Sequence, residues 1–223
     1  MLNYSLNKLP KDKSRSKDLE RLAQYAIEND HIKLHFGCGP RILKGWINID
    51  LTFESFEPYL QYYTDDHYPA ALRGNRDDLF IINILNDGLP LPDNSVDLIF
   101  HEDFFEHLTQ KEQIVFLAET FRVMKPGSVH RINTPNLVVS MLDNSSFSKG
   151  KDGVFTAEWD NWHHHNIITP SILEEMAKIV GYSEIIFNSK NHSTAAHLLP
   201  SEYRPNEKDR PSANSNVFAD LIK

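Results

Sequence analysis

The stretch at positions 35–50, HFGCGPRILKGWINID, places two glycines directly after one apolar run and an aspartate at the end of the next. Gly37 and Gly39 lack a Cβ atom, so the chain can turn sharply there and a ligand can lie against the backbone. Asp50 offers two carboxylate oxygens, which suit the two hydroxyls of a ribose. This stretch therefore predicts two strands whose ends bind a nucleoside. The alternative is that the glycines form only a turn and that Asp50 only ends a strand.

The composition favours one globular domain over residues 1–223. Of the 223 residues, 40% are hydrophobic and 24% are charged, and no apolar run approaches the roughly 18 to 20 residues that cross a bilayer. Positions 1–16 lack the apolar segment of a secretory signal, and the single cysteine, Cys38, excludes an internal disulfide. We therefore expect a cytoplasmic protein without a membrane partner. The formal net charge of -8 and the lack of a Lys/Arg-rich block argue against nucleic acid as a partner.

Helical and strand-like patterns alternate along the chain. Apolar residues that recur every three or four positions predict helices at 16–27, 110–124 and 171–180, the first of them capped by Ser16. Short apolar runs between polar or turn residues predict strands. This alternation favours an α/β fold with a mostly parallel sheet. The expected strands lie at 32–36, 46–50, 79–84, 96–100, 129–133, 184–187 and 216–222.

Three segments stand apart from this alternation. Residues 1–30 are expected to form an N-terminal helical extension. The segments 59–75 and 143–153 have no regular pattern, and the stretch 143–165 is a candidate loop on the substrate side. Long loops of compact domains are often lids or substrate loops, but surface insertions without a role are equally common.

Polar residues follow the expected strands at the positions where a parallel sheet binds its ligands. Ligands of such sheets lie beyond the carboxyl ends of the strands. Asn86 and Asp87 follow the third expected strand and could meet a base. His101, Glu102 and Asp103 follow the fourth and form the densest titratable cluster of the chain. These polar residues favour the interpretation that the ends of the first two expected strands bind a nucleoside.

Two common nucleotide-binding patterns are absent from the sequence. The dinucleotide fingerprint GxGxxG requires a third glycine where this chain has Ile42. No GxxxxGK[ST] sequence of a phosphate-binding loop occurs either. An NAD-dependent or nucleotide-sugar enzyme is therefore the less favoured alternative.

Five blocks in order resemble the class I S-adenosylmethionine-dependent methyltransferases, in particular a bacterial group whose first block reads like LNLGCGPRxLPGWINVDL. GCG alone is a weak signal, whereas five blocks in order are a strong one. The blocks are LHFGCGPRILKGWINIDL (34–51), LPLPDNSVDLIFHEDFFEHL (89–108), FRVMKPGSVHRINTPNL (121–137), HHHNIITPSILEEMAKIVGYSEI (163–185) and SNVFADLIK (215–223).

The resemblance implies a Rossmann-like class I methyltransferase fold, a mostly parallel seven-stranded sheet with helices on both faces. It implies S-adenosylmethionine as the cofactor, with Asp50 on the ribose hydroxyls and the segment 86–89 beside the adenine. His101 and Glu102 would lie beside the cofactor near the substrate mouth. The cofactor-binding residues expected from the resemblance are Phe36, Gly37, Cys38, Gly39, Asp50, Leu51, Asn86, Asp87, Leu89, His101 and Glu102.

The chain departs from the family pattern at several positions. His35 stands where the first block usually opens on an acidic residue or Asn, and Ser128 replaces the second glycine of KPGG. Ile84 lies near the position of an aspartate often seen before the LP pair. Asp103 stands where a histidine commonly precedes the Glu-His pair. A noncatalytic cofactor-binding or interaction module therefore remains an alternative.

Methyl transfer is an in-line displacement, so the enzyme must align the acceptor and, for a hydroxyl, remove a proton. The candidate catalytic residues are Asp103, His101 and His164. His107 is interpreted as a residue that braces its loop. Adjacent histidines of an extended segment point to opposite sides, so at most two of His163–His165 could share one ion with Asp103.

We accordingly expect no metal site, and we expect one histidine of this run to reach the acceptor pocket. The predicted activity is methyl transfer to a small molecule or a sugar-containing, glycan-type acceptor.

Overall fold

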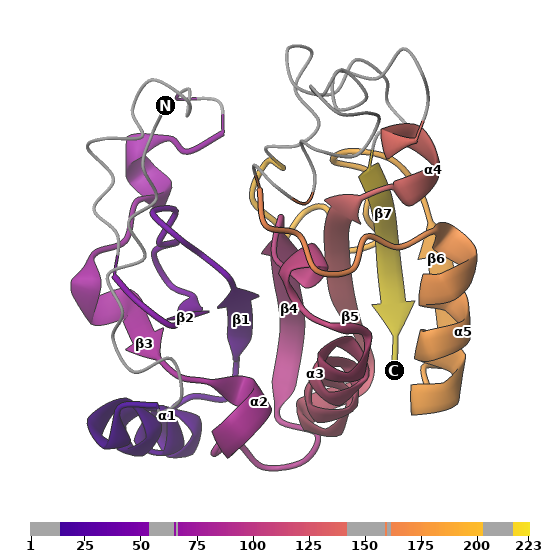
Figure 1. Ribbon diagram of the computed structural model, residues 1–223. Coiled ribbons are helices and arrows are strands. Elements are labelled where there is room, and N and C mark those ends of the chain that lie inside the picture. Colours follow the sequence, from indigo (N-terminus) through magenta and orange to yellow (C-terminus); the bar gives the residue numbers. More distant parts are fainter. Residues whose placement is uncertain (1–13, 54–64, 66, 142–158, 160–161, 203–215) are drawn as a thin grey trace.

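The computed structural model describes residues 14–53, 65, 67–141, 159, 162–202 and 216–223. Within these residues the strands form one seven-stranded sheet in the order β3-β2-β1-β4-β5-β7-β6 (Figure 1). Neighbouring strands from β3 to β5 are parallel, and β7 runs antiparallel to both β5 and β6. The expected mostly parallel sheet is confirmed. The strands are β1 (Lys33–Phe36), β2 (Ile47–Asp50), β3 (Leu79–Ile81), β4 (Val96–Glu102), β5 (Met124–Pro135), β6 (Glu184–Phe187) and β7 (Asn216–Ile222).

The helices agree with the expected pattern, and their ends have identifiable causes. In α3 the Thr109 side chain accepts from the backbone N–H of Glu112, whose carboxylate accepts from Thr109 in return. In α5 Thr169 caps the start, and Gly181 ends the helix at a φ of 119°. The α-helices are α1 (Ser16–Glu28), α2 (Ile84–Asp87), α3 (Gln110–Val123), α4 (Leu137–Ser140) and α5 (Pro170–Val180), and the 3-10 helices are η2 (Ala70–Leu72), η3 (Arg76–Asp78) and η4 (Phe105–His107).

Two local predictions are wrong. Ser16 does not cap α1, because Arg15 occupies the cap position and Ser16 is already helical. The third strand ends at Ile81 instead of continuing to position 84, because the Asn83 side chain accepts from Leu85 N and starts α2. The irregular segments are covered only in part: 59–64 and 143–153 lie outside the described residues, whereas 70–72 form η2.

The two faces of the sheet are covered differently. Along β4, Ile99 and His101 point to one face, whereas Leu98 and Phe100 point to the other, as the period of a strand requires. The first face packs against α1, α3 and α5, and α3 and α5 lie side by side (Figure 1). In the described residues, loops with η2 and η3 take the place of helices near the second face, whose core includes Leu43, Trp46, Tyr68 and Ala195.

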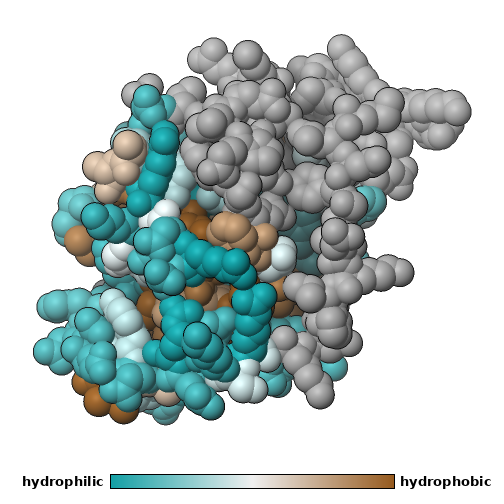
Figure 2. Space-filling view, turned by 90° about the vertical axis from the view of Figure 1, so that its left-hand side faces the viewer, coloured by the Kyte–Doolittle hydropathy of each residue, from teal (hydrophilic) through white to brown (hydrophobic). Residues whose placement is uncertain are grey.

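The exposed large hydrophobic residues of the described chain include Ile27, Val138 and Ile179. The side turned toward the viewer in Figure 2 is mainly hydrophilic, which fits the chain's acidic composition. None of the described helices is long and apolar enough to span a membrane.

Candidate active site

The glycine loop after β1 and the carboxylate that ends β2 contact each other directly. The backbone N–H of Gly39 donates to Asp50 Oδ2 over 2.8 Å, and the N–H of Leu51 donates to Asp50 Oδ1 over 2.6 Å. The pairing of β1 with β2 brings them together, since Phe36 lies opposite Ile49 in the register. The carboxylate is therefore fixed in orientation at the carboxyl ends of two adjacent strands.

Gly37 and Gly39 both have a left-handed backbone, but their surroundings differ. At Gly37, with a φ of 57°, an added Cβ would lie 2.6 Å from Cδ2 of Phe104. At Gly39, with a φ of 48°, an added Cβ would meet no described atom within 4 Å. Gly37 is thus required by packing, whereas Gly39 leaves open space beside the Asp50 carboxylate. That combination of an accessible backbone and an acidic group suits a ribose.

Arg41 anchors the glycine loop to the rest of the site. Its guanidinium is buried, pairs with Glu102 at the end of β4, and donates to the backbone carbonyls of His67 and Ser201. Glu102 also accepts a hydrogen bond from Asn133 Nδ2 over 3.2 Å. Glu102 therefore holds the loop in place through Arg41, a role that sequence reasoning did not assign to either residue.

The remaining residues expected at the cofactor have varied environments. The side chains of Phe36 and Cys38 are buried, so only their backbones could face a ligand, whereas Leu51 is half exposed. Asp87 in α2 accepts two hydrogen bonds from Ser14, and its neighbour Asn86 is exposed. Leu89 belongs to the main core.

The backbone of Leu89 bonds to Glu119 and Arg122 of α3. These contacts explain the position of Leu89 without any contact to a ligand. Glu119 and Arg122 also form an ion pair with each other, with an N–O distance of 2.7 Å.

His101 does not face a cleft, which corrects the expectation that it is catalytic or beside the cofactor. The strand β4 continues two residues beyond the predicted end, so His101 lies within the strand and has no exposed surface. Its ring packs among Phe104, Phe105, Phe116 and His130. Burial lowers the pKa of His101 well below its usual value, so the ring is neutral and a poor base.

Asp103 begins the loop after β4 and holds an unusual backbone conformation. Its φ is 48°, which is uncommon for a residue other than glycine, and its N–H donates to the carbonyl of Asn133 over 3.1 Å. Its charge acts on two neighbours: after burial, it helps to raise the pKa of Glu106, and it opposes the burial that lowers the pKa of His107. Asp103 therefore lies next to the other titratable groups of this loop.

Glu106, His107 and His164 form a cluster, and sequence reasoning missed Glu106. His164 Nε2 lies 3.8 Å from Glu106 Oε1, and the rings of His107 and His164 meet edge to face at 4.9 Å. Burial, with the charge of Asp103 next, raises the pKa of Glu106 to about 7. Of the histidine run, the structure brings His164 into this cluster. The signal that could have found Glu106 was the Glu-His pair that closes the second sequence block.

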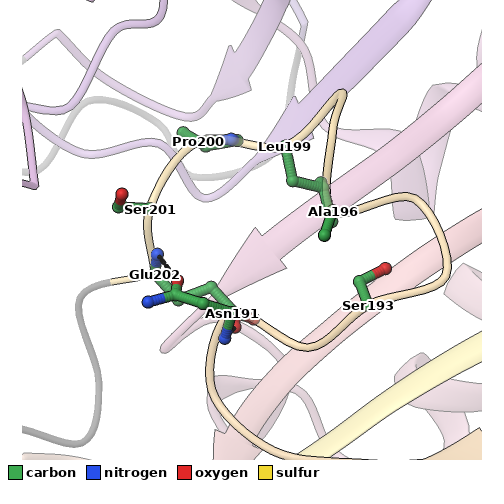
Figure 3. Close-up of a pocket in the computed structure, with 7 residues that line it drawn as sticks. All are labelled: Asn191, Ser193, Ala196, Leu199, Pro200, Ser201 and Glu202. Atoms are coloured by element: carbon green, nitrogen blue, oxygen red, sulfur yellow. Dashed lines mark hydrogen bonds between the residues drawn. The ribbon is translucent and has the colours of Figure 1, made fainter.

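The pocket shown in Figure 3 is lined by none of these predicted residues. It has a volume of about 180 Å³ and is formed by the connection between β6 and β7. Its carboxylate, Glu202, is already paired with the buried guanidinium of Arg131, at 2.7 Å. This pairing gives Glu202 a structural role. The lining residues are Asn191, Ser193, Ala196, Leu199, Pro200, Ser201 and Glu202.

The fold is that of class I methyltransferases. A crystal structure of a SAM-dependent methyltransferase from Archaeoglobus fulgidus superposes with a TM-score of 0.52, at 15% identity over 92% of each chain. Phosphoethanolamine N-methyltransferase 2 of Haemonchus contortus, in complex with phosphomonomethylethanolamine and S-adenosylhomocysteine, gives 0.51 at 14% identity over 93% of this chain and 52% of that one. At these identities the likeness shows the Rossmann-like fold.

The sequence comparison points to the same class. Residues 34–132 match the family model described as "Methyltransferase domain". A "Probable S-adenosylmethionine-dependent methyltransferase" of Mycolicibacterium smegmatis is 34% identical over 94 residues, which are 42% of this chain and 31% of that protein. The match thus spans less than a third of that relative's length.

Proposed function

We propose that this chain is an S-adenosylmethionine-dependent methyltransferase that acts on a small-molecule or sugar-containing acceptor. The observation that carries the proposal is the contact between the Gly39 backbone and the Asp50 carboxylate at the ends of β1 and β2, beside space that no described atom fills. This position in a parallel sheet is where ligands bind. The match of residues 34–132 to a methyltransferase domain supports the same function.

The residues at this edge fit the adenosyl part of the cofactor. Asp50 holds its carboxylate at the ends of β1 and β2, and two carboxylate oxygens suit the two hydroxyls of a ribose. Gly39 leaves room for the ribose, and the exposed Asn86 is the proposed polar neighbour of the base. When bound, the sulfonium centre of the cofactor supplies the methyl group. The chain itself positions the two reactants.

The acceptor is proposed to bind on the side of β4 and β5. Asp103 is the proposed general base for a hydroxyl acceptor, because it begins the loop after β4 and lies in the charged environment of Glu106 and His107. His164 is the proposed second group on this side, through its contact with Glu106. His101 is not part of the proposal, because its ring is enclosed in the core.

Calorimetric titration with S-adenosylhomocysteine tests the cofactor assignment. We expect binding by the unchanged protein, and we expect Asp50→Ala to weaken it by about 1.5 to 3 kcal/mol, roughly 10- to 150-fold, because hydrogen bonds to the charged carboxylate are lost. Asp30→Ala removes an exposed carboxylate before β1 and serves as the matched control. NAD should not bind.

The titration has two outcomes that contradict the assignment. An unchanged dissociation constant for S-adenosylhomocysteine in the Asp50 variant would show that Asp50 only ends a strand and does not bind the cofactor. Binding of NAD in place of S-adenosylhomocysteine would identify a different class of Rossmann enzyme.

A further inference from the structure

We propose that Glu106, His107 and His164 bind one divalent transition-metal ion, and that this ion holds the oxygen of the methyl acceptor. The first part rests on the geometry of the three side chains alone. The second part rests on the proposed methyltransferase function. The site differs from the cofactor site, since none of its three residues was expected to contact the cofactor.

The three side chains bring donor atoms close to one another. One ligand atom from each residue can be chosen so that all lie within 4.8 Å of one another. Ligands around a tetrahedral zinc ion lie about 3.3 to 3.6 Å apart, given bond lengths of about 2.0 to 2.2 Å. The donor atoms would therefore have to approach one another by about an ångström to close around an ion.

The buried carboxylate supplies the second observation that points to a ligand. Glu106 is 1% exposed, and its Oε2 accepts from the Thr134 hydroxyl over 2.9 Å. Its Oε1 has no hydrogen-bond partner among the described residues, and it lies 3.8 Å from His164 Nε2. A buried carboxylate oxygen without a hydrogen bond costs free energy unless a cation or donor satisfies it. A metal ion between Glu106 and the histidines would satisfy it.

Hydrogen bonds hold the loop that carries Glu106 and the segment that carries His164 together. The backbone N–H groups of His165 and Asn166 both donate to the carbonyl of Glu106, over 2.8 and 3.0 Å. Gln113 of α3 donates to the carbonyls of Phe105 and Asn166, and it accepts from the Asn166 side chain over 2.7 Å. Five hydrogen bonds therefore hold the segment that carries His164 against α3 and the loop that carries Glu106.

The donor set indicates the class of metal and leaves room for the acceptor. Two imidazoles and one carboxylate suit zinc and other first-row transition ions, and three protein ligands are typical of sites that keep an open position. His107 is the exposed member of the cluster, so the open position would face solvent.

The position of the cluster suits activation of a hydroxyl acceptor. It follows β4 and contacts β5 through Thr134, beside Asp103. A coordinated hydroxyl loses its proton more easily, because the ion stabilises the negative charge on oxygen. The proton would pass to the Asp103 carboxylate, the oxygen would form a C–O bond to the methyl group, and the C–S bond of the sulfonium would break. The thioether leaves as the neutral product.

Titration of the metal-stripped full chain with Zn²⁺ tests the proposal. We expect one Zn²⁺ per chain by calorimetry and elemental analysis, and we expect Glu106→Gln and His164→Ala to weaken binding at least 10-fold each. His165→Ala is the matched control, because it removes a neighbouring ring outside the cluster. His107→Ala provides a third variant at an exposed position, where folding is least at risk.

The same proteins are titrated with S-adenosylhomocysteine, so that the two proposals fail separately. Zn²⁺ binding that is absent, or equally strong in all the variants, would overturn the metal site and leave a buried Glu106–His164 ion pair. If the cofactor still binds in that case, the methyltransferase proposal stands. If His165→Ala weakened Zn²⁺ binding as much as the cluster variants do, the ion would be assigned to the exposed histidines and the proposal would be overturned. Addition of EDTA should abolish methylation of any acceptor that is found.

Discussion

The two ends of the candidate site are built in different ways. At the proposed cofactor end, Gly39 and Asp50 lie 11 positions apart and meet through the pairing of two adjacent strands. At the proposed acceptor end, Glu106 and His164 come from distant parts of the sequence and meet because a loop is fixed on η4 and α3. A local motif can thus reveal the first contact, whereas the second exists only in the folded chain. The experiments below separate the contributions of the two ends.

The largest effect is expected at the acceptor end. Asp103→Asn should lower turnover by roughly a hundredfold or more while affinity for S-adenosylhomocysteine stays nearly unchanged, because general-base catalysis is typically worth that much. Steady-state kinetics and cofactor titration of the same variant check this. Loss of cofactor affinity with unchanged turnover would place Asp103 at the other end of the site.

The next effect separates packing from binding within the glycine loop. Gly37→Ala should destabilise the fold by about 2 kcal/mol or more, because the left-handed backbone costs about 1 to 2 kcal/mol and the new methyl group overlaps Phe104. Gly39→Ala should destabilise the fold only by the cost of the left-handed backbone, but its methyl group would enter the space proposed for the cofactor. Thermal unfolding and cofactor titration should therefore rank the two variants in opposite order. The same rank in both measurements would contradict the distinction.

The smallest effect concerns two buried histidines, His35 in β1 and His130 in β5. Burial lowers the pKa of each to about 3, below the ordinary value of 6.5. Between pH 6.5 and pH 3 the unfolded chain therefore binds more protons than the folded chain. The free energy of unfolding is highest above about pH 6.5 and falls as the pH drops toward 3.

From pH 7 to 5.5, each histidine should lower the free energy of unfolding by about 1 kcal/mol. Urea unfolding at the two pH values should show this loss reduced by that amount in His35→Gln and in His130→Gln. An unchanged pH dependence in either variant would show that its ring already binds protons in the folded state.

The sequence indicated the sheet because each strand carries its own apolar pattern and each helix its own caps. Thr109 and Gly181, for example, mark ends of α3 and α5 through contacts within a few residues. His101 was misassigned for a physical reason. Both faces of β4 are buried, so its apolar run gives no alternation that shows where the strand ends. Two more strand residues placed His101 inside the core.

The acceptor end could not be derived in the same way. Nothing near Glu106 in the sequence shows that the histidine run will fold over it, because that contact depends on Gln113 and Asn166, 53 positions apart. Arg41 illustrates the same limit, since its partner Glu102 and the Ser201 carbonyl lie on other segments. Such contacts depend on the completed fold and not on local pattern.

The position of β7 also has a consequence for how the protein is made. This strand, residues 216–222, lies between β5 and β6 in the sheet. Neither β5 nor β6 can pair with β7 until β7 has left the ribosome. At about 5 to 20 residues per second, the interval after β5 is roughly 4 to 17 seconds. During this time an internal strand of the sheet exposes an unpaired backbone edge, which can pair with other chains. Yield in the cell should therefore depend on chaperones that act on the nascent chain.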